Sequence, residues 1–169
     1  MTTTYISQEN RIGPFNPNIV DTVQAVPVGT RTRAVDSNGN ACEFIYLQGV
    51  ASCLVGSSVS WDAAMVTALT PIGVRQSRPI AIATAAVSAA TSFGWFQIAG
   101  RAVAKKTTWS VSLVAGANVG MIGVGLVGAS VSGKEVFGAA VDTLSANLST
   151  NKTVILCISN PHMTGAIAG

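Results

Sequence analysis

Short apolar segments separated by turn residues run through nearly all of the chain after residue 22, and this pattern constrains the fold most. Within a segment such as Ile-Gly-Val-Gly-Leu at residues 122–126, apolar residues recur at every second position, which is the period of a strand. We expect strands at residues 23–28, 31–36, 42–47, 57–61, 79–86, 93–99, 101–104, 109–114, 122–131, 136–141 and 153–159. Many short strands with glycine-rich turns predict an all-β fold with little helix, either a small β-barrel or a sandwich.

Local signals refine this prediction. Asn38-Gly39 lies between segments 31–36 and 42–47 and predicts a β-hairpin, because a type I′ turn needs positive φ at both central residues. Gly49 and Gly100 each follow a candidate strand in an apolar-x-apolar-x-Gly-x-Ala pattern, as expected where a barrel strand bends at a corner. Residues 141–148 are the best candidate for a short helix. The alanine-rich stretch 81–90 has helical propensity, but we interpret its first part as a strand.

The chain divides into three regions. Residues 1–22 are polar and carry Gly13-Pro14 and Asn16-Pro17, where each proline disfavours helix at the residue before it, so we expect an extended N-terminal arm. Residues 23–107 are predicted to form a β-barrel or sandwich domain. Residues 108–169 hold further strands, which either complete that domain or form a small second one. A floppy terminus is the alternative for the arm.

The chain has unusually few charges with which to cover its surface. Only 10% of its residues are charged and 49% are hydrophobic, so the chain either lies in a membrane or has much of its surface covered by partners. Residues 111–131 carry no charge and could span a bilayer. Glycines weaken a helix there, and we favour buried strands and no membrane partner, because the window contains Gly116, Gly120, Gly123, Gly125 and Gly128.

No residue pattern indicates catalysis or a bound metal. His162 is the only histidine, and neither a cysteine nor a carboxylate stands at ligand spacing from it. The seven acidic residues form no paired-carboxylate motif. Residues 123–128 match GxGxxG, but no βαβ unit surrounds them, so we interpret these glycines as structural. We therefore expect no enzymatic activity, no cofactor and no metal site.

Three features of the sequence indicate which partners the chain binds and in which compartment it is made: its charge, its cysteines and its N-terminal residues. The net charge of +3 comes from ten scattered basic residues, so we expect no nucleic-acid partner. Cys42, Cys53 and Cys157 have no CxxC spacing and predict no disulfide framework. The first residues lack the basic start and apolar core of a secretory signal. These features are typical of a protein made in a reducing cytoplasm.

Three tryptophans are the most conspicuous aromatic residues. Side chains of this kind on alternating strands fill a core or the centre of an interface more often than they stack on ligands. Stacking on sugars or bases is the alternative. We therefore name as possible interface aromatics Trp61, Trp95 and Trp109.

Several stretches resemble the head decoration (cement) proteins of tailed bacteriophages. Residues 43–51 lead from a strand into Gly-Val-Ala, and residues 55–62 follow with a Gly-x-x-Val-x-Trp-Asp strand. Residues 78–83 and 93–100, the latter with a Gly-Trp-x-Gln-Ile-x-Gly pattern, belong to the same resemblance. The ending at residues 159–165, Ser-Asn-Pro-His-Met-Thr-Gly, is also similar to that family.

The resemblance implies a non-enzymatic β-rich virion subunit made in the host cytoplasm. Such a subunit binds the outer capsid surface, often as a homotrimer, and stabilises the shell by bridging major capsid protein subunits. We expect residues 2–22 to lie on a neighbouring subunit, and their deletion to abolish capsid binding while the β domain stays folded. The arm residues expected to contact the partner are Tyr5, Ile6, Arg11, Ile12, Phe15 and Ile19. The alternative is a phage tail or receptor-binding module that recognises carbohydrate through the tryptophans.

Overall fold

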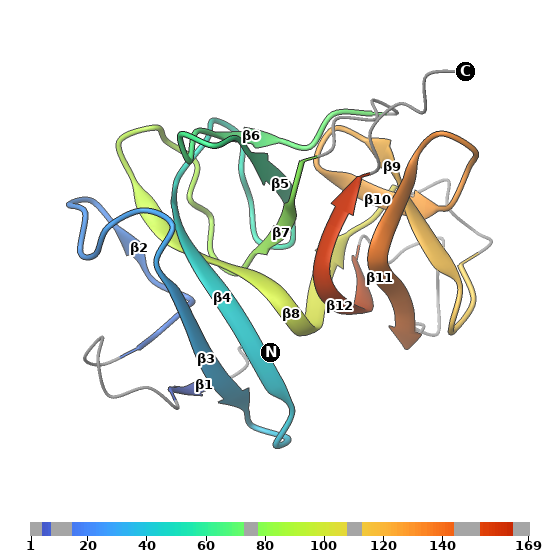
Figure 1. The fold of residues 1–169 in the computed structure, drawn as a ribbon, viewed down its shortest axis with the longest axis horizontal. Helices are drawn as coiled ribbons and strands as arrows, with labels where there is room; N and C mark the ends of the chain where they lie inside the picture. The colour runs from blue at the N-terminus through green and yellow to red at the C-terminus, as the bar shows by residue number, and fades with distance from the viewer. Residues whose placement is uncertain (1–4, 8–14, 73–77, 108–112, 144–152, 164–169) are drawn as a thin grey trace.

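A computed structural model describes residues 5–7, 15–72, 78–107, 113–143 and 153–163. Within these residues there is no helix, and twelve strands form one curled sheet whose strand pairings are all antiparallel (Figure 1). The all-β prediction is confirmed, and the curled sheet agrees with the expected barrel or sandwich. None of the described segments is a helix with the length and apolar character needed to cross a membrane.

The strands follow one another closely along the chain. Their bounds are β1 (Tyr5–Ser7), β2 (Val20–Asp21), β3 (Arg31–Asp36), β4 (Ala41–Gln48), β5 (Ser58–Trp61), β6 (Thr67–Leu69), β7 (Ile80–Ala83), β8 (Phe93–Lys105), β9 (Asn118–Gly123), β10 (Leu126–Ala129), β11 (Glu135–Thr143) and β12 (Thr153–Met163). Along the main path the order is β1-β3-β4-β8-β12-β11-β9-β10. In addition, β2 and β7 pair with β8, and β5 pairs with β6 and β7.

The long strand β8 joins the two halves of the sheet. Residues 93–99 pair with β4, and residues 99–105 pair with β12, so the two predicted strands 93–99 and 101–104 are one. Gly100 lies between them at φ +96°, where a Cβ would lie 2.5 Å from the carbonyl oxygen of Ala41. Only glycine tolerates both conditions. Figure 1 shows β8 running from the β3–β4 side of the molecule to the β12 side.

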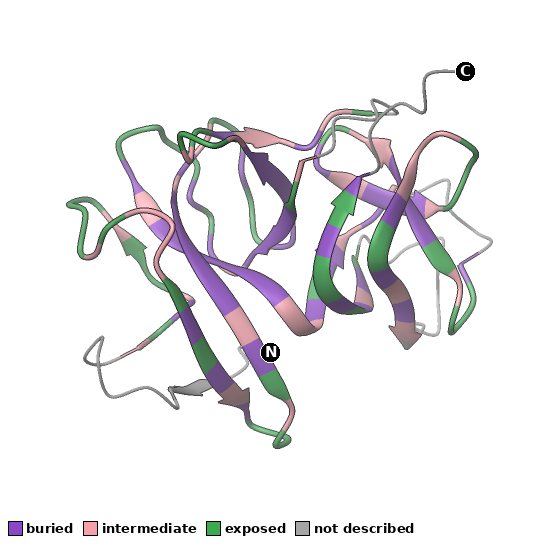
Figure 2. Cartoon of the chain, in the orientation of Figure 1, coloured by how far each residue is buried: buried purple, intermediate pink, exposed green. Residues whose placement is uncertain are grey.

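Three hydrophobic clusters pack around this sheet. Along β4, Phe44 and Tyr46 belong to a cluster under the segment that follows the arm, while Ile45 and Leu47 face a second cluster with β5 and β7. The third cluster fills the concave side of β9–β12 and the end of β8. Because a strand points successive side chains to opposite faces, β4 is buried on both faces over most of its length (Figure 2).

The sheet curls until its last strand, β10, reaches the end of the central strand β8. Lys106, just after β8, forms a parallel bridge with Val127 of β10, and the Thr107 amide donates to the Val127 carbonyl over 3.0 Å. The β9–β10 turn also contacts the other half, since the Gly125 amide donates to the Thr70 carbonyl over 2.8 Å. The strands after residue 113 thus continue the same sheet instead of standing apart from it.

Several segment predictions are confirmed and others are wrong. The hairpin at Asn38-Gly39 is present, with Arg33 opposite Glu43, but its turn is not type I′, because Gly39 has positive φ and Asn38 does not. Residues 122–131, predicted as one strand, instead contain the end of β9, a turn and β10. Residues 23–28 are not a strand, because this segment crosses the Tyr46 cluster and the Ala25 amide bonds to a side chain. Residues 141–143 belong to β11 and are not helical. The rest of 141–148, and 109–112, lie outside the described residues.

Candidate functional site

The described parts of the N-terminal arm lie along this chain's own sheet. The backbone of Tyr5–Ser7 pairs with Ala34–Asp36 at the edge of β3, and Val20–Asp21 pairs with the start of β8. Arg11 and Ile12, which we expected to contact a partner, lie outside the described residues. Contact of the arm with a neighbouring subunit stays a prediction.

Phe15 and Asp21 fasten the end of the arm to the sheet. The Phe15 ring lies 5.1 Å from Phe44 and 5.2 Å from Trp95, centroid to centroid. The Tyr46 hydroxyl donates to Asp21 Oδ2 over 2.7 Å, and the Thr84 hydroxyl donates to the carbonyl of Pro17. Phe15 is therefore partly buried by the chain's own packing, and its contact with a partner stays a prediction.

On both sides of Asp21, at the end of the arm and just after it, the chain presents apolar side chains outward. Ile19 is 51% exposed and Val23 is 78% exposed, and Val20 between them is also exposed. Single exposed apolar residues are ordinary on protein surfaces. Three within five residues, on a backbone held by β2 and by Phe15, form a local apolar strip, which we call the arm strip.

The tryptophans fill the interior. Trp61 is 5% exposed and packs with Val59 and Ile98 in the cluster beside β5. Trp95 is 7% exposed and packs edge to face against Tyr46 at 5.1 Å. Neither indole ring is exposed on the surface of the described chain. Trp109 lies outside the described residues.

Ionisable groups are scattered over the described segments. The Arg101 guanidinium pairs with Asp142 at 2.6 Å, and both side chains are about one-third exposed. Asp36 lies in the β3–β4 turn, where burial raises its pKa, but hydrogen bonds from Asn40 and Asn38 outweigh burial and lower that pKa below its ordinary value. No group of three metal-ligating side chains occurs among the described residues.

The remaining sequence candidates have structural places. Gly123–Gly128 forms the end of β9, the turn and the start of β10, and no helix follows it, so the GxGxxG match is not a dinucleotide fingerprint. His162 lies at the end of β12, where its ring stacks on Phe137 at 6.0 Å and 26°. Cys42 and Cys53 are buried free thiols, and Cys157 is an exposed one.

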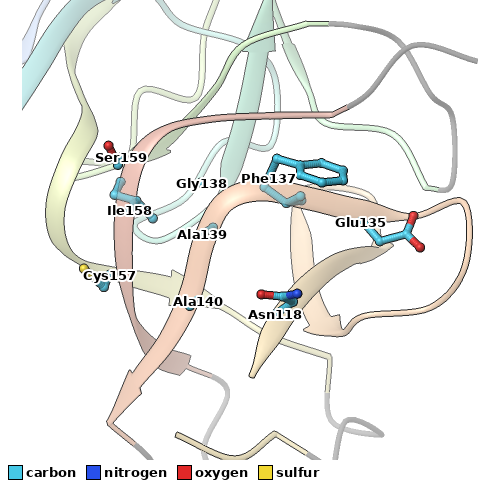
Figure 3. A pocket seen from close by; sticks show the side chains of 10 residues that line it. Asn118, Glu135, Phe137, Gly138, Ala139, Ala140, Cys157, Ile158 and Ser159 are labelled. Atoms are coloured by element: carbon cyan, nitrogen blue, oxygen red, sulfur yellow. The ribbon is translucent and has the colours of Figure 1, made fainter. Parts of the chain in front are cut away.

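A hollow of about 360 Å³ opens between β9, β11 and β12. Figure 3 shows Asn118, Glu135 and Phe137 around it, with Ser159 on the β12 side. None of these four residues was predicted from sequence to bind a ligand. The available signal was Gly138 inside a strand pattern, because an isolated glycine in a strand indicates a bulge.

Comparisons with protein-family models, with curated proteins and with solved structures find no match for this chain. The arm strip and the hollow are the two surface features of the described chain that could bind a partner or a ligand.

Proposed function

We propose that this chain is a structural virion protein that binds the outer surface of a tailed-phage capsid and stabilises the shell by bridging major capsid protein subunits. It acts without catalysis or cofactor, as a homo-oligomer for which we expect a trimer. The proposal needs neither nucleic acid nor membrane as a partner. Synthesis in the host cytoplasm and residence on the capsid surface complete it.

The arm strip is the observation that carries this proposal. Ile19, Val20 and Val23 stand outside every hydrophobic cluster of the described chain, while the backbone beneath them is fastened by Phe15 and by pairing of β2 with β8. Apolar groups held in fixed positions bind a partner with little loss of conformational entropy. Many such contacts, repeated over one shell, give a large avidity.

Low charge and the family resemblance support the same proposal. Only 10% of the residues are charged, which is typical of a surface that partners cover. The segments that resemble decoration proteins include β4, β5, β7, the first part of β8 and the end of β12, so most of the resemblance falls on the half of the molecule that carries the arm strip.

Co-sedimentation with undecorated phage shells tests the proposal. We expect the wild-type chain to sediment with the shells and the double variant Ile19→Ser, Val23→Ser to stay in the supernatant. Val124→Ser is the matched control, because Val124 is similarly exposed but lies in the β9–β10 turn. Equal binding by both variants, or no binding by the wild type, contradicts the proposal. Light scattering of the free chain gives the oligomeric state.

The alternative, carbohydrate recognition through the tryptophans, lacks an exposed tryptophan among the described residues. Burial of Trp61 and Trp95 in separate clusters leaves neither indole face open to a sugar. Stacking on a sugar would need a different ring on the surface.

A further inference from the structure

We propose that the hollow between β9, β11 and β12 is a binding site for a neutral saccharide. This inference is independent of shell binding, and it places an aromatic contact at Phe137 instead of at the tryptophans. A volume of about 360 Å³ lies at the small end of the range for ligand sites.

Two irregularities in the sheet build the hollow. On one side of β11 the pairing with β9 goes from Val136–Val119 directly to Ala140–Asn118, so three residues of β11 have no partner there. On the other side, pairing with β12 slips between Phe137 and Ala139. Gly138 lies in this slip at φ +73°, and a Cβ on it would overlap the carbonyl oxygen of Ser159. The hollow is thus a fixed part of the backbone.

Phe137 supplies an apolar platform at the edge of the hollow. Its side chain is 49% exposed, although a phenylalanine on a strand is ordinarily buried. The His162 ring stacks on it at 6.0 Å and limits its movement. The negative face of an aromatic ring attracts weakly positive C–H groups, such as those on one face of a sugar ring.

Three polar side chains complete the hollow: Asn118, Glu135 and Ser159. A carboxylate accepts hydrogen bonds, while an amide and a hydroxyl both donate and accept, so together they match the hydroxyl groups of a sugar. No lysine, arginine or histidine lines the hollow, and Glu135 is its one charged residue. An anionic ligand would therefore be repelled. One carboxylate does not supply the pair that glycoside hydrolysis needs, so the site binds and does not cleave.

Amide chemical shifts of the full-length chain test this inference. We expect maltotriose or tri-N-acetylchitotriose, both neutral, to shift the amides around Phe137 and Asn118, and an anionic hyaluronan tetrasaccharide to leave them unchanged. Phe137→Leu keeps an apolar side chain without the ring, and we expect it to weaken the binding about fivefold or more. Val103→Ala, on the outer face of β8 and similarly exposed, is the matched control and retains full affinity.

Shifts confined to amides away from the hollow, or no shift with either neutral saccharide, overturn the inference. Equal binding of the anionic tetrasaccharide overturns the predicted selectivity. A dispersed amide spectrum of Phe137→Leu shows that the variant is folded, so a loss of binding in it reports on the ring. Since no shells are present, failure here leaves the proposed capsid role standing, and failure of shell binding leaves this site standing.

Discussion

The phenolic hydroxyl of Tyr46 donates a 2.7 Å hydrogen bond to Oδ2 of Asp21 and thereby ties the end of the arm to the centre of the sheet. The same hydroxyl oxygen accepts a 3.1 Å hydrogen bond from the Ala25 amide. Tyr46 is fully buried. One side chain of β4 therefore satisfies two groups of the segment that crosses above it.

Removing this hydroxyl should destabilise the chain and loosen the arm strip. Tyr46→Phe keeps the ring stacking but leaves the Asp21 carboxylate and the Ala25 amide without this partner, which costs about 1–3 kcal/mol. Urea unfolding measures the change in the free energy of unfolding. An unchanged midpoint in Tyr46→Phe would show that solvent replaces both hydrogen bonds.

The same tyrosine should make the stability fall at alkaline pH. Burial, reinforced by the hydrogen bond to Asp21, raises the pKa of Tyr46 from 10.0 to about 12. A folded-state pKa above the unfolded value contributes stability that is complete below pH 10 and is lost as pH rises toward about 12.

Absorbance of the ionised phenol checks this prediction in a Tyr5→Phe background, because the chain has two tyrosines. Burial also raises the pKa of Cys53 to about 11, so ionisation of this thiol lowers stability over the same pH range. The part due to Tyr46 is therefore the difference in alkaline stability loss between Tyr5→Phe and the double variant Tyr5→Phe, Tyr46→Phe. Titration near pH 10 in the folded chain would contradict the prediction.

Gly138 should tolerate substitution much less than Gly116. Both have positive φ, +73° and +80°, but a Cβ would overlap the Ser159 carbonyl only at Gly138, whereas nothing lies within 4 Å of it at Gly116. We expect Gly116→Ala to cost about 1 kcal/mol, the strain of the backbone alone. Gly138→Ala should cost at least twice as much, because two bulged strands must also move. Thermal unfolding measures both, and equal losses would disprove the steric explanation.

The Asp36 turn should make stability depend on acidic pH. The lowered pKa of Asp36 contributes stability above the ordinary carboxylate pKa of about 4, and that contribution is lost as pH falls through the lower folded value. Asp36→Asn removes the titration but keeps an oxygen that accepts from the Asn38 and Asn40 amides. We expect its urea midpoint to change less than that of the wild type between neutral pH and pH values below about 4. The prediction is contradicted if the urea midpoints of Asp36→Asn and the wild type fall equally with pH.

The effect of deleting the arm on stability should depend on where the deletion ends. Deletion of residues 2–22 removes Phe15 and Asp21, so we expect a loss of about 2–4 kcal/mol of stability in addition to any loss of binding. The expectation drawn from sequence, that the β domain stays folded, is kept, but we now expect a less stable domain. Deletion of residues 2–14 keeps both side chains and removes the short strand β1 from the edge of β3, so it should cost clearly less stability. Urea unfolding of the two deletions tests this, and similar stabilities would contradict it.

Local signals allowed most strands to be predicted, because a turn residue or a period-two pattern acts within a few positions. Asn38-Gly39 specified its hairpin in this way. Segments 93–99 and 101–104 were predicted as two strands, but the bend predicted at Gly100 lies inside the single strand β8, where a Cβ would meet Ala41 and Cys42.

The candidate sites were less predictable, because they depend on residues distant in sequence. Phe15 meets Trp95 and Phe44 only after β4 and β8 have paired, so its role as a fastening has no local signature. The hollow likewise joins Asn118 to Ser159 across three strands. The tryptophans were conspicuous in sequence, but the size that made them so also favours their burial.

Strand β7 couples the unfolding of the two halves of the molecule. Ile80 and Ile82 belong to the cluster inside β9–β12, and the intervening Ala81 and Ala83 belong to the cluster beside β4 and β5. The four residues of β7 thus separate the two hydrophobic clusters and contribute side chains to both. Neither cluster can be exposed to water without removing the packing on one face of β7. The two clusters should therefore unfold together, in one cooperative transition.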